Sequence, residues 1–191
     1  MERYLDNSAT TPLCEAAKQA IREAMECYGN PSSLHPEGVR AGMLLEQARR
    51  RIAATLGLRG TLSPGQVIFT ASGTEADTLA LRGTAYAKSR RKGGRIITTD
   101  SEHSAVEKTV AALESEGFEV VRIPTRQGVL DLDAYEKALN DRVFLVSLMT
   151  VNNETGALYD VGTAFAMAKA KNPDVVTHTD AVQGFLKVPF C

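Results

Sequence analysis

The sequence contains no tryptophan, only three cysteines and no long apolar run. The most apolar stretch, Val143 to Val151, is too short to span a bilayer and contains Ser147 and Thr150. The first six residues already mix acidic and basic side chains, so we expect no signal peptide there. Three cysteines are an odd number, and they lack the spacing of a metal or redox motif. These absences predict a cytoplasmic protein that has neither a disulfide framework nor a membrane span.

The sequence also lacks an excess of charge of either sign. Twenty-two Lys and Arg residues balance 23 Asp and Glu residues, which leaves a net charge of −1 and no global attraction to nucleic acid or an anionic membrane. The basic stretch from Lys88 to Arg95 is typical of the solvated C-terminal end of a helix. With 191 residues and 43% hydrophobic residues the chain can bury a core, and no repeat or low-complexity segment interrupts it.

Two helices are predicted before any strand. Thr11-Pro12 is a favourable helix start, and the apolar periodicity that follows ends at Gly29-Asn30-Pro31. A second helix carries an apolar stripe from Leu44 to Leu56 that we expect to be buried, and Gly57 suits its C-terminal cap.

From residue 67 onward the predicted elements alternate. Short apolar runs predict strands at 67–69, 95–98, 119–123, 144–149 and 174–177, and helical patterns lie near 75–88, 104–116, 132–140 and 161–171. Such alternation predicts an α/β fold of three layers with a mostly parallel sheet. Ligands of such sheets bind beyond the carboxyl ends of the strands, so the polar residues that follow each strand are the candidates for a site.

A candidate anion site follows the first predicted strand. Ser72 and Glu75 have the spacing of a capping box, so a helix should begin there. Gly73 and Thr74 at a helix N-terminus offer amides, a hydroxyl and the positive end of the dipole, which together suit a phosphate. Taken alone, the segment is more typical of a plain capped helix than of a phosphate site.

Three further candidates follow later strands. His103 precedes a predicted helix in which Ser104 and Glu107 have capping-box spacing, and Asn153 lies in a turn-like segment. Asp180, with Gln183 beyond it, should emerge at the ligand edge, because alternation places it on the same face as His178. A metal hydrolase that uses His178, Asp180 and His103 is a weak alternative, and a serine hydrolase lacks its G-x-S-x-G motif. The combination suits pyridoxal 5′-phosphate, whose phosphate needs a helix N-terminus and whose ring nitrogen needs a carboxylate.

The ordered motifs resemble the cysteine desulfurases, which are class V aminotransferase-like enzymes on the type I pyridoxal-phosphate fold. The similar segments are Tyr4 to Pro12, Gly29 to Ser33, Ser72 to Asp77, Glu102-His103, Val151 to Gly156 and Asp180 to Gln183. The resemblance implies that residues 1–30 form an N-terminal segment and helix, and that residues 31–191 form part of the cofactor-binding large domain.

The resemblance also implies the role of each candidate residue. Gly73 and Thr74 should hold the phosphate, His103 should stack on the ring and move protons, and Asn153 should lie near the ring and substrate. Asp180 should pair with the pyridine nitrogen, and Gln183 should bind the phenolic oxygen. The implied reaction converts L-cysteine to L-alanine in a homodimer. It leaves sulfur as an enzyme persulfide that passes to an acceptor or scaffold protein for iron–sulfur clusters or thiolated RNA.

One departure from the family concerns the cofactor lysine, which in the family lies beyond the Asp–Gln segment in a Ser-x-His-Lys motif. The only lysine after Gln183 is Lys187, which is too close to match, and the nucleophilic cysteine of the family comes later still. We therefore expect an N-terminal portion, truncated before the end of the sheet and the small domain. We expect it to be inactive alone and to self-associate through an unfilled sheet edge. A selenocysteine lyase, another class V aminotransferase and a silent binding fragment remain alternatives.

Overall fold

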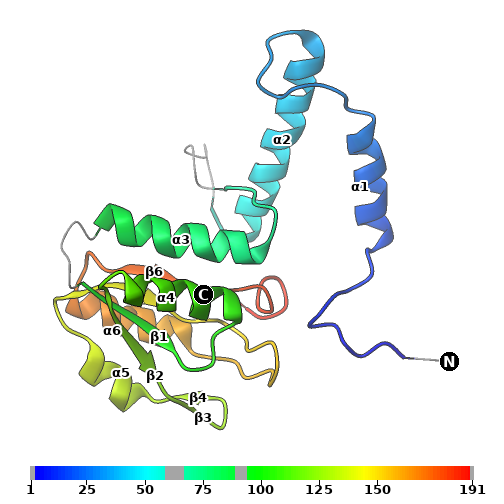
Figure 1. The fold of residues 1–191 in the computed structure, drawn as a ribbon. Helices are drawn as coiled ribbons and strands as arrows, with labels where there is room; N and C mark the ends of the chain where they lie inside the picture. Colours follow the sequence, from blue (N-terminus) through cyan, green and yellow to red (C-terminus); the bar gives the residue numbers. More distant parts are fainter. Residues whose placement is uncertain (1–2, 59–66, 89–93, 190–191) are drawn as a thin grey trace. The chain divides into compact units, whose positions relative to one another are not determined.

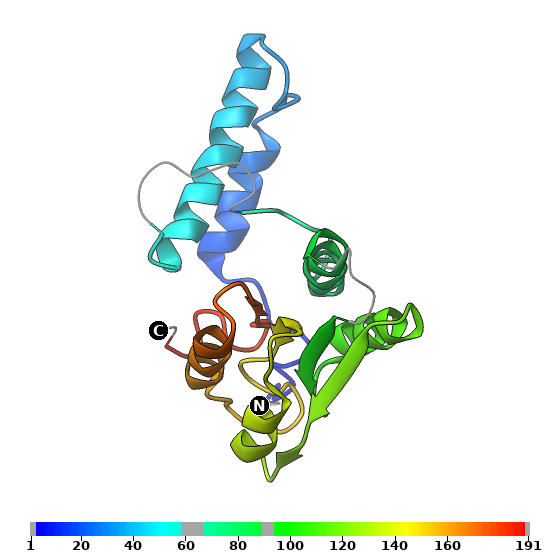
Figure 2. The same ribbon diagram turned by 90° about the vertical axis from the view of Figure 1, so that its left-hand side faces the viewer.

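The computed structural model describes residues 3–58, 67–88 and 94–189, and Figures 1 and 2 show their arrangement within each part of the chain. The chain forms two compact units, residues 1–69 and 70–191. Compactness does not identify the segment that binds a cofactor, so the domain division at residues 30 and 31 stays a prediction.

The first unit contains two helices, α1 (Glu15–Met25) and α2 (Pro36–Thr55). The predicted start at Thr11-Pro12 is wrong: α1 begins at Glu15, where an acidic residue favours the positive end of the helix dipole. His35 caps α2 by accepting a hydrogen bond from the Gly38 amide at 3.3 Å, with Pro36 at the first helical position. Gly57 follows the helix with φ +71°, as predicted for a C-terminal cap.

The predicted burial of the α2 stripe is also wrong at its two ends. Leu44 is 41% exposed and Leu56 is 46% exposed. Among the described residues of this unit only Gly38 and Ala53 are buried, because two helices provide no second layer to cover them.

The second unit is built on a parallel sheet. Its strands are β1 (Arg95–Thr99), β2 (Glu119–Ile123), β5 (Val143–Ser147) and β6 (Val176–His178), in the spatial order β2-β1-β5-β6. The predicted strand at 67–69 is wrong, since those residues are irregular. The short hairpin of β3 (Thr125–Arg126) and β4 (Val129–Leu130) was not predicted. Gly128 in its turn has φ +79°, which favours glycine.

Helices cover both faces of this sheet, as predicted (Figure 1). Residues of α3 (Gly73–Lys88) and α4 (Ser104–Ser115) pack with Ile96 and Leu145 on one face. Residues of α5 (Leu132–Ala138) and α6 (Val161–Lys171) pack with Ile97 and Val146 on the other. Neighbouring residues of one strand thus serve opposite cores, which is why the strands read as continuous apolar runs.

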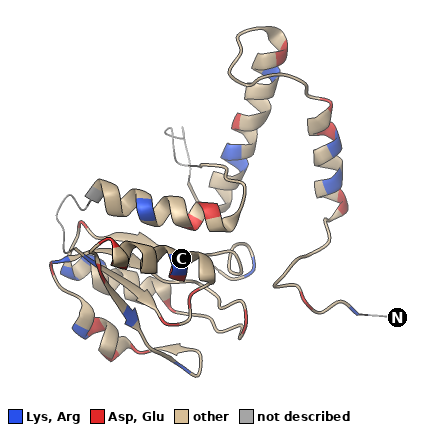
Figure 3. Cartoon of the chain, in the orientation of Figure 1, with Lys and Arg blue, Asp and Glu red and all other residues tan. Residues whose placement is uncertain are grey.

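Charged residues of both signs are interspersed along the helices of each unit (Figure 3). Most of the basic stretch near residue 90 lies outside the described residues, and Arg95 at its end pairs with Glu119 at 2.6 Å. No helix in the described ranges is long and apolar enough to cross a membrane.

Candidate functional site

The carboxyl ends of three neighbouring strands bring three of the candidate residues to one edge of the second unit. His103 follows β1, Asn153 follows β5 and Asp180 follows β6, and these strands are adjacent and parallel. Hydrogen bonds tie the three connections together: the Asn152 side chain donates to the Ser101 carbonyl, and the Thr150 amide donates to the Asp180 carbonyl, both at 2.9 Å. The sheet therefore holds segments that are far apart in the sequence beside one another.

The N-terminus of α3 supplies the anion-binding candidates, Gly73 and Thr74. The predicted capping box is confirmed, because the Ser72 hydroxyl accepts from the Glu75 amide at 3.1 Å and the Glu75 carboxylate accepts from the Ala71 amide at 2.7 Å. The amides of a first helical turn have no partner within the helix. Among the described residues the Ser72 hydroxyl accepts from the Glu75 amide alone. The amides of Gly73 and Thr74 can therefore bind another group.

Gly73 also explains how α3 approaches the segment after β6. A Cβ atom at this position would lie 3.2 Å from Cγ2 of Val182, which is tighter than an ordinary contact. The absence of a side chain therefore lets the first turn of α3 lie directly against the segment from Asp180 to Gln183. Two candidate groups, one from residues 73–74 and one from residues 180–183, are adjacent for this reason.

His103 is itself the cap of α4, so the predicted capping box of Ser104 and Glu107 is wrong. Its Nδ1 accepts from the Ala105 amide at 3.2 Å, and Glu107 instead binds Arg122 of β2 at 3.1 Å. A backbone amide can only donate, so Nδ1 is unprotonated and the neutral ring carries its proton on Nε2. The exposed ring thus presents an N–H group that can donate a hydrogen bond.

Asp180 is 7% exposed, and its Oδ1 accepts from the Val182 amide at 2.9 Å. This bond turns the chain sharply after β6 and leaves the carboxylate with further acceptor capacity, since an ionised carboxylate can accept about four hydrogen bonds. Three residues later, Oε1 of Gln183 accepts from Lys187 at 2.9 Å. The segment therefore offers a carboxylate that suits a cationic nitrogen and an amide that can donate to an oxygen.

The two adjacent asparagines have different surroundings. Asn152 is buried, and its Oδ1 accepts from the amides of Glu154 and Thr155 at 3.0 and 2.8 Å, so it shapes the loop. Asn153 is half-buried and follows this scaffold directly. The structure thus leaves Asn153, the residue selected from the sequence, as the member of the pair that can contact a ligand.

Glu102 is a buried acid that the sequence analysis did not single out beyond its motif. Its Oε1 accepts from the Thr99 hydroxyl at 2.8 Å and from the Met149 amide at 2.9 Å, which links β1 to the end of β5. Its Oε2 is buried and has no hydrogen-bond partner in the described structure. Burial raises the pKa of Glu102, the hydrogen bonds from Met149 and Thr99 lower it, and the negative charges of Asp180 and Asp77 raise it. Together these effects raise the pKa to about 7.

His178 and Asp77 also meet in this region, on the side of the sheet that α3 covers. His178 Nε2 lies 3.5 Å from Asp77 Oδ1, and its Nδ1 lies 2.9 Å from the Ser147 hydroxyl. Within the described ranges no group of three or more His, Cys, Asp or Glu side chains could hold a metal ion. The metal-hydrolase alternative therefore gains no support, since His178 turns toward Asp77 rather than toward His103.

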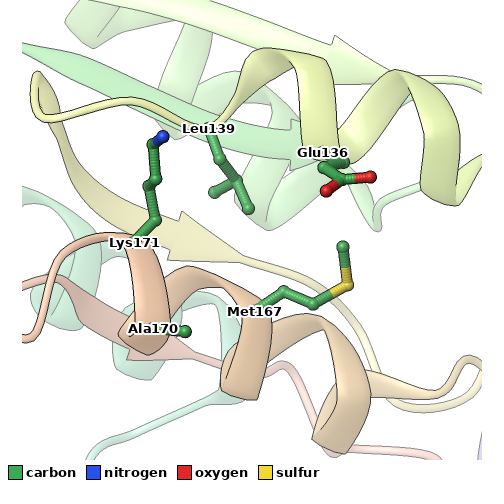
Figure 4. A pocket seen from close by; sticks show the side chains of 5 residues that line it. All are labelled: Glu136, Leu139, Met167, Ala170 and Lys171. Carbon is green, nitrogen blue, oxygen red and sulfur yellow. The ribbon is translucent and has the colours of Figure 1, made fainter.

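Two cavities of the second unit lie outside the candidate residues. One of about 500 Å³ is lined by Ser101, Gly128, Asn152, Thr155 and Tyr159 among others, beside the loops that carry His103 and Asn153. The other, of about 310 Å³, lies between α5 and α6, where Leu139 lies between Lys171 and Glu136 with Met167 below them in the view of Figure 4. None of the six candidate residues lines either cavity.

The candidate groups together match the parts of pyridoxal 5′-phosphate. The free amides at the N-terminus of α3 suit the phosphate, the buried carboxylate of Asp180 suits a protonated ring nitrogen, and the amide of Gln183 suits the phenolic oxygen. The exposed ring of His103 is flat enough to stack on a pyridine. Residues 1–191 thus contain a donor set that fits this cofactor.

The family model described as aminotransferase class-V matches residues 3–190. Among curated proteins, the chain is 45% identical to a cysteine desulfurase of Cereibacter sphaeroides over 193 residues, which covers 99% of the chain and 48% of that protein. It is 39% identical to the cysteine desulfurase IscS of Dictyoglomus turgidum over 190 residues, which covers 98% of the chain and 46% of the relative. The chain spans about half the length of the curated relatives it matches.

Two solved structures are also similar to this chain. A NifS-like protein superposes with a TM-score of 0.89 at 37% identity, covering 100% of this chain and 51% of the other. The structure of SspA in complex with cysteine superposes with a TM-score of 0.86 at 32% identity, covering 97% of this chain and 52% of the other. The predicted α/β fold with its mostly parallel sheet is confirmed by these similarities.

Proposed function

Because this chain belongs to the cysteine desulfurase family of class V aminotransferases, we propose that the whole protein uses pyridoxal 5′-phosphate to remove sulfur from L-cysteine. The products are L-alanine and a persulfide on the enzyme. The observation that carries the proposal is the close approach of the first turn of α3, with Gly73 and Thr74, to the segment that contains Asp180 and Gln183. This approach supports the proposal because it leaves the proposed phosphate-binding turn beside the segment that carries the proposed partner of the ring nitrogen.

Each end of the proposed site has a separate task. Gly73 and Thr74 bind the phosphate through amides and a hydroxyl at the positive end of the α3 dipole. Asp180 holds the ring nitrogen in its protonated form, and Gln183 donates to the phenolic oxygen. When bound, the cofactor supplies an electron sink for the bonds to the α-carbon of the substrate.

His103 provides the proton-transfer group in this proposal. Its Nδ1 accepts from the Ala105 amide, so Nε2 is the ring atom that faces the substrate. The ring takes up a proton at Nε2 once its own proton has moved to Nδ1 and the bond from Ala105 is released, and the protonated ring can later return a proton from Nε2. The same hydrogen bond fixes the ring at the start of α4, where it can cover one face of the pyridine. Asn153 lies on the neighbouring connection and contacts the ring and substrate.

The remaining parts of the proposal concern the whole protein. We infer that it works in the cytoplasm as a homodimer and passes its sulfur to an acceptor or scaffold protein, for iron–sulfur clusters or thiolated RNA. Residues 1–191 supply the phosphate and ring-binding half of the site. In the family, the lysine that binds the cofactor covalently and the cysteine that accepts sulfur lie in segments that follow the match to this chain.

A paired assay tests the proposed function. The whole protein, incubated with cysteine, pyridoxal 5′-phosphate and a thiol reductant, should release sulfide and alanine in equal amounts. Residues 1–191 alone should release no more sulfide than the free cofactor does in buffer, because their site lacks the family's covalent lysine. A folded whole protein that forms no alanine from cysteine contradicts the proposed function, and rapid sulfide release by residues 1–191 contradicts the division of roles.

A further inference from the structure

Asp77 and His178 form a buried contact between α3 and β6 that has no part in the roles given above. The side chains are 9% and 16% exposed, and Asp77 Oδ1 lies 3.5 Å from His178 Nε2. On its other side the His178 ring lies 2.9 Å from the hydroxyl of Ser147, which is fully buried on β5. The imidazole is therefore held between an acid on α3 and a hydroxyl on the sheet.

Each residue of this pair lies close in the sequence to one end of the proposed cofactor site. Asp77 lies about one helical turn beyond Gly73 and Thr74, since an α-helix has about 3.6 residues per turn. His178 lies two residues before Asp180, a spacing that places both side chains on the same face of an extended segment. One contact thus joins the helix that carries the phosphate site to the strand that leads to the ring-nitrogen site.

A second contact, at the first residue of α3, also limits the motion of the helix. Gly73 meets Val182, whose amide donates to Asp180. With the Gly73 contact at the start of α3 and the Asp77 contact one turn later, the first turn can neither slide along nor rotate against residues 178–182. Loss of the Asp77 contact would leave a buried group without its partner and free this turn to shift.

We propose that Asp77 and His178 are positioning residues that set the distance between the phosphate-binding turn of α3 and Asp180. They thereby select ligands that carry a phosphate at one end and a basic heterocyclic nitrogen at the other. The ligand class rests on the proposed function, whereas the anchoring of α3 does not. Ser147, His178 and Asp77 also have the order of a hydrolytic triad, but Ser147 is fully buried and cannot meet a substrate.

Ligand affinities test the selection. The probe is pyridoxine 5′-phosphate, which lacks the aldehyde and forms no adduct with lysines, compared with inorganic phosphate on residues 1–191. Asp77→Ala and His178→Ala should each weaken binding of pyridoxine 5′-phosphate between about tenfold and a hundredfold and change phosphate affinity less than about twofold. The double variant should be no weaker than either single variant, because the two residues act as one unit. Asp77→Asn, which still accepts a hydrogen bond, should recover most of the loss.

Amide hydrogen exchange tests the anchoring without any ligand. Asp77→Ala should speed exchange in the first two turns of α3 by about tenfold or more and leave α4 unchanged. Asp133→Ala, which removes an exposed acid from the first turn of α5, is the matched control and should change neither measurement.

The outcomes separate the two claims. If the parent chain binds no pyridoxine 5′-phosphate yet the Asp77 variant still loosens α3, the anchoring stands and the cofactor proposal fails. If the parent binds the probe and both alanine variants bind it equally well, the positioning role is overturned. Unchanged exchange in α3 overturns the anchoring itself.

Discussion

Replacing Asp180 by asparagine should lower kcat for alanine formation from cysteine by about a thousandfold in the whole protein. A neutral amide at this position cannot hold the ring nitrogen protonated, so the electron sink is lost while the shape of the site is kept. The loss should fall mainly on kcat, because the substrate binds through other groups. Steady-state kinetics with alanine detection provide the measurement.

The matched control for this prediction is Asp174→Asn. Asp174 is exposed and precedes β6, so its replacement changes the same charge near the same strand without entering the site. Its kcat should stay within about twofold of the parent. If the Asp180 variant keeps more than a tenth of the parent activity, Asp180 does not serve as the partner of the ring nitrogen.

Replacing Glu102 by glutamine should change how stability depends on pH. Burial raises the pKa of Glu102 to about 7 from an ordinary value of 4.5, so the folded protein favours the protonated acid. The stability that protonation provides is fully present below about pH 4.5 and is lost as the pH rises through about 7. Glutamine keeps an acceptor oxygen for Thr99 and Met149 but never ionises, so the variant does not suffer this loss.

The expected size of this effect is large for one residue. Between about pH 5 and pH 8, the free energy of unfolding of Glu102→Gln relative to the parent should rise by about 3 kcal/mol. Urea denaturation of residues 1–191 at both pH values measures it. Glu136→Gln, at an exposed position on α5, is the control and should show a change below about 0.5 kcal/mol. A relative stability of Glu102→Gln that is independent of pH would show that Glu102 stays ionised.

The regular elements that the sequence predicted well are those whose signals are local. The helix at 161–171 and the strand at 119–123 have the predicted bounds, and Ser72 with Glu75 fixed the start of α3. The helices have their caps and periodicity within their own residues, and the strand pairs with β1. Apolar alternation and capping chemistry were sufficient there because no distant partner competes with them.

The failures share a different cause, which is competition from residues distant in the sequence. Glu107 has the right spacing to complete a capping box, yet Arg122 on β2 takes its carboxylate and leaves His103 as the cap of α4. Residues 67–69 have the composition of a strand but form no ladder, because a strand exists only where a neighbouring backbone pairs with it.

The same reason explains which site residues the sequence could supply. The order of motifs pointed to His103, Asp180 and the four other candidates, all of which follow strands or begin helices. Glu102 and Asp77 were not identified, because their importance comes from burial against β5 and β6. Such burial cannot be predicted from composition and spacing. The alternation of β6 predicted only that His178 shares a face with Asp180, and the structure adds that His178 meets Asp77 of α3.

The central claim is that residues from four separate segments bind one small ligand. Amide NMR spectra of isotope-labelled residues 1–191, titrated with pyridoxine 5′-phosphate, test it most directly. The amides of Gly73, Thr74, His103, Asn153 and the segment from Asp180 to Gln183 should shift together and saturate with a single Kd. Shifts scattered over the surface, or confined to one of these segments while the others stay unchanged, would contradict the claim.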